Sequence, residues 1–165
     1  MKIAVLSDIH DNIWNLEKVL NKLKDKEIKA IIFCGDFCAP FTFIKLAKFG
    51  IPIYAVFGNV DGAHQEIIEQ ANKNYKNVKL DKYLLEIELD DRKIAFCHID
   101  KFAKGLASTK KYDAVFYGHT HKTGVEKIGK TLLANPGEIH GLKGECSFGI
   151  YDTETNEIKI IKIGD

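Results

Sequence analysis

The first half of the chain alternates short apolar runs with segments whose apolar residues recur at helical spacing. The apolar runs stop at glycine or polar residues, as buried strands do, and they cover Lys2–Ser7, Ala30–Cys34 and Ile53–Phe57. Each run precedes a predicted helix: one carries Leu16, Leu20 and Leu23 behind an Asp11 or Asn12 cap, one covers Phe41–Phe49, and one includes Ile67, Ile68 and Ala71. Strand–helix units in series predict parallel crossovers.

The second half is richer in predicted strands. A helix is predicted over Phe102–Lys110, and strands are predicted at Tyr83–Leu89, Lys93–Cys97, Ala114–Tyr117, Val125–Ile128, Thr131–Ala134, Phe148–Tyr151 and Ile158–Ile163. Asp90, Asp91 and Arg92 form a predicted hairpin turn, and the later strands are expected to form a mostly antiparallel second sheet. Because no linker or repeat separates the halves, residues 1–165 are expected to form a single α/β (α+β) domain, with two stacked sheets and helices outside.

Composition narrows the class of protein. The chain has 165 residues, of which 45% are hydrophobic and 28% charged, so it is neither disordered nor membrane-embedded. Its formal charge of +1 favours neither nucleic-acid polymers nor acidic membranes as partners. The opening MKIAVLSDIH is too short and polar for a signal peptide, and four cysteines are too few for a disulfide scaffold. A cytoplasmic protein is expected.

Polar residues that can bind metals follow five of the predicted strands. In a parallel-rich sheet the carboxyl ends of strands lie at one edge, so these side chains are expected to converge: Asp8, His10, Asp36, Asn59, His98, His119 and His121. The two i, i+2 pairs among them are expected to face one side of an extended segment. Four imidazoles, two carboxylates and one amide oxygen could hold two divalent metal ions, and they suit Mn, Fe, Ni, Co or Zn better than Ca or Mg.

Each of these residues has an ordinary explanation when it is taken alone. The Asp8-x-His10 pair can occur by chance, and so can the His119-x-His121 pair, although it is the stronger metal signal. Asp36 could cap a helix, Asn59 could be a turn residue, and His98 could be a core histidine. All five groups fall at strand ends in chain order. Their common position favours a shared metal site over a separate, unrelated explanation for each group.

Six short motifs occur in order between Lys2 and about Gly137. They are SDIH at Ser7–His10, CGD at Cys34–Asp36, GN at Gly58–Asn59, the isolated His98, GHTH at Gly118–His121 and NPG at Asn135–Gly137. With this ordered set the chain resembles the calcineurin-like metallophosphoesterase family. Its length most resembles the small bacterial and archaeal phosphodiesterase branch.

The resemblance implies a four-layer fold of two mixed β-sheets flanked by helices, which agrees with the predicted elements. It also implies that Asp8, His10 and His121 hold one metal ion, that Asn59, His98 and His119 hold the other, and that Asp36 bridges them. A metal-bridging hydroxide would attack the phosphorus of a small phosphodiester of aryl, nucleotide or cyclic-nucleotide type. Two divalent transition metal ions are expected as cofactors, with manganese first and nickel, iron, cobalt and zinc as alternatives.

Two positions depart from the family's pattern. Many members have a histidine at the position of Val60 that helps to protonate the leaving group, and valine cannot transfer a proton. Because general acid help is worth roughly 10²–10⁴-fold, we expect a preference for good leaving groups such as aryl esters. His64 or His140 could substitute from a nearby loop, or both could be surface residues. Glu138 stands where the family often has serine after NPG.

Three other functions are compatible with the sequence. The retromer scaffold subunit resembles this small fold but has lost metal ligands and acts through protein contacts, whereas all seven positions here carry side chains able to bind metal. A nuclease is disfavoured by the short chain and its charge of +1. A phosphomonoesterase is disfavoured because such members usually keep the histidine absent at position 60. The alternation of Ile and Lys near the C-terminus leaves a homodimer open.

Three further patterns do not predict a site. Gly124–Thr131 matches the P-loop pattern GxxxxGK[ST], which needs a helix after the glycine-rich loop, but strands are predicted on both sides of a Gly129–Lys130 turn. The C-x3-C pair Cys34 and Cys38 is expected to be packed rather than to bind zinc. An aromatic group after the second strand is expected to be core rather than the wall of a site: Phe37, Phe41 and Phe43.

Overall fold

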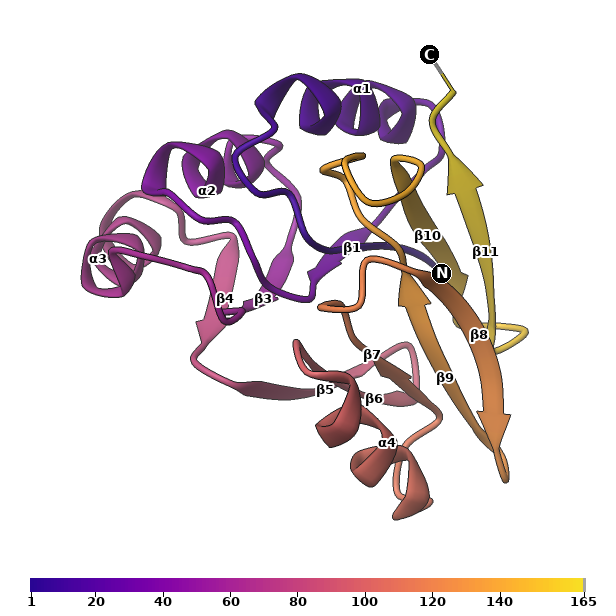
Figure 1. The fold of residues 1–165 in the computed structure, drawn as a ribbon. Helices are drawn as coiled ribbons and strands as arrows, with labels where there is room; N and C mark the ends of the chain where they lie inside the picture. The colour runs from indigo at the N-terminus through magenta and orange to yellow at the C-terminus, as the bar shows by residue number, and fades with distance from the viewer. Residues whose placement is uncertain (165) are drawn as a thin grey trace.

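The computed structural model describes residues 1–164, which form two β-sheets packed face to face with helices on the outer surfaces (Figure 1). The first sheet comprises β1 (Lys2–Leu6), β2 (Ala30–Phe33), β3 (Ile53–Val56), β4 (Val78–Asp81), β10 (Ser147–Asp152) and β11 (Glu157–Lys162). The second comprises β5 (Leu84–Leu89), β6 (Arg92–Cys97), β7 (Ala114–Phe116), β8 (Thr123–Ile128) and β9 (Thr131–Pro136). The helices of the described chain are α1 (Ile13–Lys24), α2 (Pro40–Ala47), α3 (His64–Asn74) and α4 (Asp100–Ser108). The predicted architecture of two mixed sheets flanked by helices is confirmed.

The sheet membership and the strand directions differ from the prediction in the second half of the chain. In the first sheet the order is β11-β10-β1-β2-β3-β4, with β10 antiparallel beside β1 so that Ile3 lies opposite Tyr151. The expectation that β10 and β11 belong to the second sheet is therefore wrong, because an apolar run identifies a strand without identifying its partner. The second sheet has the order β5-β6-β7-β9-β8 and is not mostly antiparallel, since β7 runs parallel to both β6 and β9.

One strand, β4, was not among the predicted elements. It holds two apolar residues, Val78 and Leu80, that alternate with Lys79 and Asp81. So short an alternation does not distinguish a strand from a loop. The strand forms because its backbone pairs in parallel with β3 at the edge of the first sheet, with Val78 opposite Ile53.

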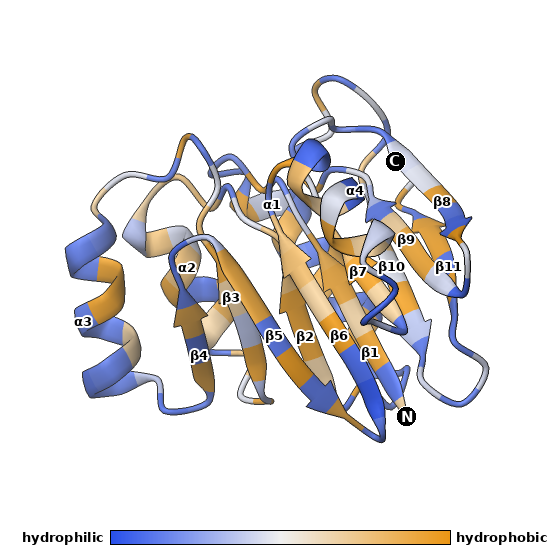
Figure 2. Ribbon diagram, turned by 90° about the horizontal axis from the view of Figure 1, so that it is seen from below, coloured by the Kyte–Doolittle hydropathy of each residue, from blue (hydrophilic) through white to orange (hydrophobic). Residues whose placement is uncertain are grey.

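Apolar side chains fill the spaces between the layers. The helices α1, α2 and α3 cover the outer face of the first sheet through residues such as Leu16, Phe43 and Ile67. Ala103 and Ala107 of α4 pack against the outer face of the second sheet. The layer between the sheets includes Ile3, Val5, Ile32, Phe96, Phe116 and Tyr151. In Figure 2 most strand segments are apolar, whereas polar residues concentrate on helices and loops.

The aromatic residues after β2 divide between core and surface. Phe37 stacks on Phe33 with ring centroids 4.1 Å apart and meets Phe43 edge-on at 5.6 Å. Phe41 is 53% exposed. The core prediction is therefore confirmed for Phe37 and Phe43. It is wrong for Phe41, which is the second residue of α2 and points to solvent.

The segment that matches the P-loop pattern is a β-hairpin. β8 and β9 pair antiparallel with Ile128 opposite Thr131, and Gly129 turns the chain with a φ of 62°. Because a strand rather than a helix follows the turn, this segment lacks the helix N-terminus that binds phosphate in a P-loop. Within residues 1–164, none of the helices combines the length and the apolar character needed to cross a membrane.

Candidate metal centre

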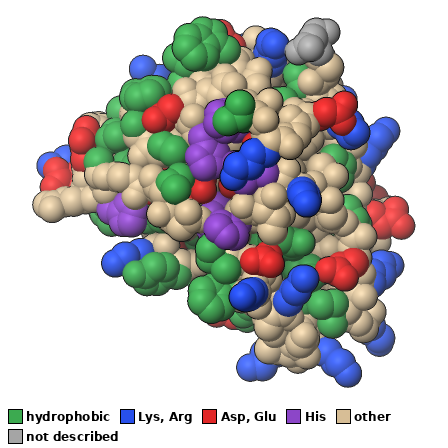
Figure 3. Space-filling view, in the orientation of Figure 1, with side chains coloured by type: hydrophobic (Ala, Val, Ile, Leu, Met, Phe, Trp, Pro, Cys, Tyr) green, Lys and Arg blue, Asp and Glu red, His purple; other side chains and the backbone are tan. Residues whose placement is uncertain are grey.

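Loops from both sheets meet beyond the carboxyl ends of five strands. The loops after β1, β2 and β3 come from the first sheet, and those after β6 and β7 come from the second. The Asp8 peptide N–H donates to the Gly35 carbonyl (3.0 Å), and the Gly118 N–H donates to the His98 carbonyl (3.1 Å). Figure 3 shows histidine side chains gathered around a hollow near the middle of this face, with acidic side chains between them. The structure thus brings the predicted residues together.

One group of ligand atoms comes from the loops after β1 and β7. Single atoms of Asp8, His10 and His121 lie within 4.8 Å of one another. Asp8 Oδ1 is 3.6 Å from His10 Nε2 and 3.4 Å from His121 Nε2. The two imidazole rings stack with centroids 4.8 Å apart. Asp8 Oδ1, His10 Nε2 and His121 Nε2 are therefore close enough together to bind one metal ion.

A second group joins the two sheets. Asn59 Oδ1 lies 2.9 Å from His98 Nε2 and 2.7 Å from His119 Nδ1. Asp36 Oδ2 is 3.2 Å from His98 Nε2 and 3.5 Å from His10 Nε2, so this carboxylate stands between the first group and the second. This is the central position that the family resemblance implies for Asp36.

The backbone at these residues is left-handed rather than extended. Five of the seven have positive φ angles between 45° and 67°: Asp8, His10, Asp36, His119 and His121. The expectation of extended i, i+2 pairs is therefore wrong, although both pairs do turn toward the site. Left-handed backbone is uncommon outside glycine and is concentrated at functional sites. Here it turns the chain sharply at the end of a strand.

The His98 nitrogen that faces away from the site, and the side chains of Asp61 and Asn12, have backbone partners. His98 Nδ1 lies 2.8 Å from the carbonyl oxygen of Cys34. Asp61 makes no hydrogen bond or ion pair with a histidine among residues 1–164; its carboxylate accepts the peptide N–H groups of Asp36 (3.0 Å), Cys38 (2.8 Å) and Gly58 (2.6 Å). Its role is to hold the loops after β2 and β3 together.

Asn12 likewise supports backbone rather than a ligand ring. Its side chain caps α1 by accepting from the Asn15 N–H (3.1 Å), and it donates to the His140 carbonyl (2.8 Å). The Cys34 thiol is buried between the sheets, as expected. The Cys38 sulfur lies 3.6 Å from His10 Nδ1, at the margin of the candidate centre rather than in the apolar core.

Sequence reasoning missed the role of Glu138. This residue is completely buried, and its Oε2 contacts His121 Nδ1. Its Oε1 accepts the peptide N–H of Lys143 (2.7 Å) and that of Gly144. The available signal was a glutamate directly after the NPG motif, where the chain departs from the family's usual serine.

Charged neighbours set the protonation of the site. Burial opposes the charged form of His98, but the adjacent Asp36 carboxylate outweighs it and raises the pKa of His98. Burial also opposes ionisation of Asp36, yet hydrogen bonding with His98 lowers the pKa of Asp36 below its ordinary value. The nearby Asp8 carboxylate, together with that of Asp36, raises the pKa of His10. The carboxylates therefore favour positive charge at their histidine neighbours.

The donor set fits the metal ions that the family resemblance implies. Asp8, Asp36 and Glu138 are at most 1% exposed, and ionised carboxylates are costly to bury unless positive charge is close. Asp8 Oδ1 and His10 Nε2 are buried without a hydrogen-bond partner among residues 1–164. Imidazole, carboxylate and amide donors together suit a divalent transition metal.

The residues considered as substitutes for the missing general acid lie in different places. The His140 ring stands beside that of His10, with centroids 5.2 Å apart. The His64 ring stacks on Phe57 at 4.0 Å, at the start of α3. Val60 is 46% exposed, and its peptide N–H donates to Asp36 Oδ1 (3.1 Å). Position 60 thus contributes its backbone to the centre.

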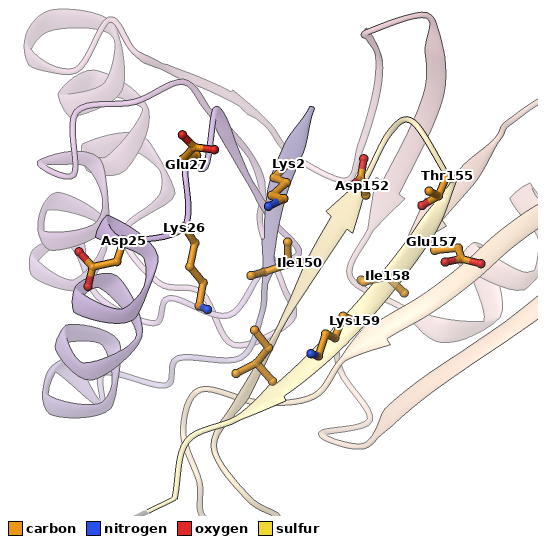
Figure 4. A pocket seen from close by; sticks show the side chains of 11 residues that line it. Lys2, Asp25, Lys26, Glu27, Ile150, Asp152, Thr155, Glu157, Ile158 and Lys159 are labelled. Carbon is orange, nitrogen blue, oxygen red and sulfur yellow. The ribbon is translucent and has the colours of Figure 1, made fainter.

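A groove lies toward the opposite end of β1 (Figure 4). It has a volume of about 620 Å³ and is lined by α1–β2 loop residues and by the outer faces of β10 and β11. Its lining residues carry both signs of charge, with Lys2, Lys26 and Lys159 among Asp25, Glu27, Asp152 and Glu157. The seven predicted site residues lie elsewhere, and the candidate centre is not this groove.

Comparison with known proteins supports the same assignment of family. Residues 1–156 match the calcineurin-like phosphoesterase superfamily domain. The chain is 34% identical over 165 residues to Phosphodiesterase MJ0936 of Methanocaldococcus jannaschii, covering 98% of both chains.

Solved structures show the same fold. A structure described as a novel archaeal phosphodiesterase superposes with a TM-score of 0.90 at 32% identity, covering 99% of this chain and 100% of that one. Vps29 of Chaetomium thermophilum superposes with a TM-score of 0.73, covering 99% and 97%, but at 13% identity it shows the fold alone. The chain therefore belongs to the calcineurin-like phosphoesterase superfamily, a family of metal-dependent phosphoesterases.

Proposed function

We propose that this chain is a phosphodiesterase that hydrolyses small phosphodiesters of aryl, nucleotide or cyclic-nucleotide type with two divalent metal ions. One ion is assigned to Asp8, His10 and His121, the other to Asn59, His98 and His119, and Asp36 to both. Such a pair of ions makes a water molecule nucleophilic near neutral pH and neutralises charge on phosphoryl oxygens. Manganese is the first candidate, followed by nickel, iron, cobalt and zinc.

The observation that carries the proposal is the pair of unpartnered atoms in the first group. Asp8 Oδ1 and His10 Nε2 are buried, lie 3.6 Å apart, and accept no hydrogen bond from residues 1–164. Buried polar atoms nearly always have a partner, and exceptions call for an explanation such as an ion. A cation held by Asp8, His10 and His121 would give these atoms a partner.

The surrounding backbone supports the ligands before any substrate arrives. Val60 N–H donates to Asp36 Oδ1, which leaves Asp36 Oδ2 directed at the two histidines on either side of it. His119 N–H (3.1 Å) and Ser7 Oγ (2.6 Å) both donate to Asp8 Oδ2, which leaves Asp8 Oδ1 free. In each carboxylate, one oxygen accepts the hydrogen bonds that orient the group, and the other oxygen is available to bind a metal ion. Preorganisation of this kind lowers the cost of stabilising charge during a reaction.

His140 is the candidate for the proton donor that Val60 cannot be. Its peptide N–H donates to the Asp8 carbonyl (2.9 Å), and the side chains of Asn12 and Asn15 donate to its carbonyl oxygen. Its ring, half-buried beside His10, is therefore held at the rim of the centre. His64 is less suited because its ring stacks on Phe57.

The test is turnover of bis-nitrophenyl phosphate by metal-stripped protein, with Mn²⁺, Ni²⁺, Zn²⁺ or Mg²⁺ added singly. We expect hydrolysis that depends on the added metal and that His119→Ala abolishes. Lys130→Ala, an exposed change at the β8–β9 turn, is the matched control and should behave as the parent.

Two outcomes would redirect the proposal. Metal binding without turnover of any phosphoester would contradict an enzymatic role and favour a protein-binding role for the same fold. Faster turnover of nitrophenyl phosphate than of the diester would instead indicate a phosphomonoesterase.

A further inference from the structure

We propose that Glu138 is a positioning residue that couples metal binding at His121 to the order of the loop at positions 141–145. The proposal rests on the metal centre assigned above. It concerns a residue that the family's motif does not supply, since the position after NPG is often serine. Glu138 acts through His121 and through the loop rather than on a substrate.

The first half of the coupling is the contact with His121. A carboxylate oxygen can only accept, so His121 Nδ1 is the donor to Glu138 Oε2 and Nε2 carries the lone pair. Nε2 is the atom that faces Asp8 Oδ1 at 3.4 Å. Hydrogen-bonded carboxylates of this kind fix the tautomer and the ring orientation of metal-binding histidines and increase their basicity.

The second half is the contact with the loop. Residues 141–145 are exposed, yet the N–H groups of Lys143 and Gly144 turn inward to Glu138 Oε1. The Glu138 carbonyl also accepts the Ser147 N–H (2.9 Å), which closes the loop at its far end. His121 and Lys143 line one small cavity of about 190 Å³. One buried carboxylate therefore anchors both the ring and the loop.

Glutamine at this position cannot do both tasks. A carboxamide is isosteric with a carboxylate but has a single acceptor oxygen, and its NH₂ group only donates. In Glu138→Gln, either His121 loses the acceptor for Nδ1 or the Lys143 and Gly144 amides lose theirs. The coupling is reciprocal by thermodynamic linkage, so zinc bound at His121 must stabilise the loop by as much as the ordered loop strengthens zinc binding.

The experiment uses metal-stripped full-length protein and Zn²⁺, which is diamagnetic. Calorimetry measures zinc affinity, and NMR measures the His121 tautomer and the hydrogen exchange of the Lys143 and Gly144 amides. In the parent we expect the Nδ1–H tautomer and slower exchange of both amides when zinc binds. We expect Glu138→Gln to bind zinc roughly 10–100-fold more weakly, which is the usual effect of losing a carboxylate that is hydrogen-bonded to a metal ligand. We also expect zinc to have no effect on the loop in this variant. Glu145→Gln makes the same charge change on the exposed part of the loop and should match the parent.

The outcomes separate this proposal from the one on which it rests. A parent protein that binds no zinc overturns the metal centre and the coupling together. A parent that binds zinc, with unchanged affinity in Glu138→Gln or unchanged amide exchange on zinc binding, overturns the coupling alone. The exchange measurement on the parent needs no variant, so a variant that fails to fold leaves the test decisive.

Discussion

His98 and Cys34 join the two sheets at the candidate metal centre, with His98 Nδ1 2.8 Å from the Cys34 carbonyl oxygen. A carbonyl oxygen only accepts, so Nδ1 carries the proton and Nε2 presents a lone pair. That lone pair faces Asn59 Oδ1 at 2.9 Å and Asp36 Oδ2 at 3.2 Å. Three such atoms repel one another unless a proton or a cation lies among them, and the metal ion proposed above would meet this need.

Chelation should lower the thermal stability of the protein. A ligand at 100 times its Kd stabilises the folded state by about 2.7 kcal/mol, and each kcal/mol shifts Tm by about 2–4 °C in a chain of this size. One occupied site therefore corresponds to about 5–11 °C. Differential scanning calorimetry with and without EDTA measures the shift, which His10→Ala should reduce. An equal Tm in both conditions contradicts metal binding in the folded state.

Gly118→Ala should damage the centre through steric overlap. A Cβ atom there would lie 1.9 Å from Ser7 Oγ and 2.5 Å from Asp8 Oδ2, so both side chains must move. Overpacking of this kind costs about 1–3 kcal/mol, and we expect diesterase activity to fall with it. Urea denaturation and turnover of bis-nitrophenyl phosphate measure the two effects.

Gly105→Ala is the matched control for that change. Gly105 lies within α4, and a Cβ atom there has no neighbour within 4 Å among the described residues. Alanine in a helix interior is favoured over glycine by about 0.5–1 kcal/mol, so this variant should be slightly more stable and fully active. Equal behaviour of the two variants would contradict the close approach at Gly118.

His140→Ala should affect substrates according to their leaving group. If His140 donates the proton, the loss on an alkyl diester approaches the roughly 10²-fold lower bound for general acids, whereas a nitrophenolate leaves without help. The measurement is kcat/KM for both substrate types, with the exposed neighbour change Leu142→Ala as control. An equal loss on both substrates would assign His140 a structural role.

Alkaline pH should destabilise the fold through Tyr151. Burial raises the pKa of Tyr151 to about 12, against roughly 10 in an unfolded chain. Because the folded state favours the neutral phenol, this contribution to stability is complete below about pH 10 and is lost as the pH rises toward about 12. Urea denaturation at pH 8, 10 and 11 should show the free energy of unfolding falling.

The variant Tyr151→Phe separates the two effects of this side chain. It removes the hydrogen bond from the Tyr151 hydroxyl to Asn156 Oδ1 (2.8 Å), which costs about 1 kcal/mol at pH 8. It should also make the fall above pH 10 shallower. A slope identical to that of the parent would show that other groups cause the alkaline loss.

The ends of the strands were predictable because the chain changes there from buried apolar residues to polar residues that can bind metal. Buried strands must be apolar, so the first polar residue after each run marks its end, and Asp36 and His119 stand out for this reason. The edge strand β4 and the sheet membership of β10 were not predictable. Both depend on backbone pairing with β3 and β1, which hydrophobic periodicity does not record.

The sequence by itself determined the family, the two-sheet architecture and the seven side chains that could bind metal, because these follow from local patterns and ordered motifs. Only the tertiary structure decided how those side chains are aimed. His98 is oriented by a carbonyl 64 positions away and His121 by Glu138, 17 positions away. Such contacts join residues from separate loops, and their partners become visible only when the chain has folded both sheets against each other.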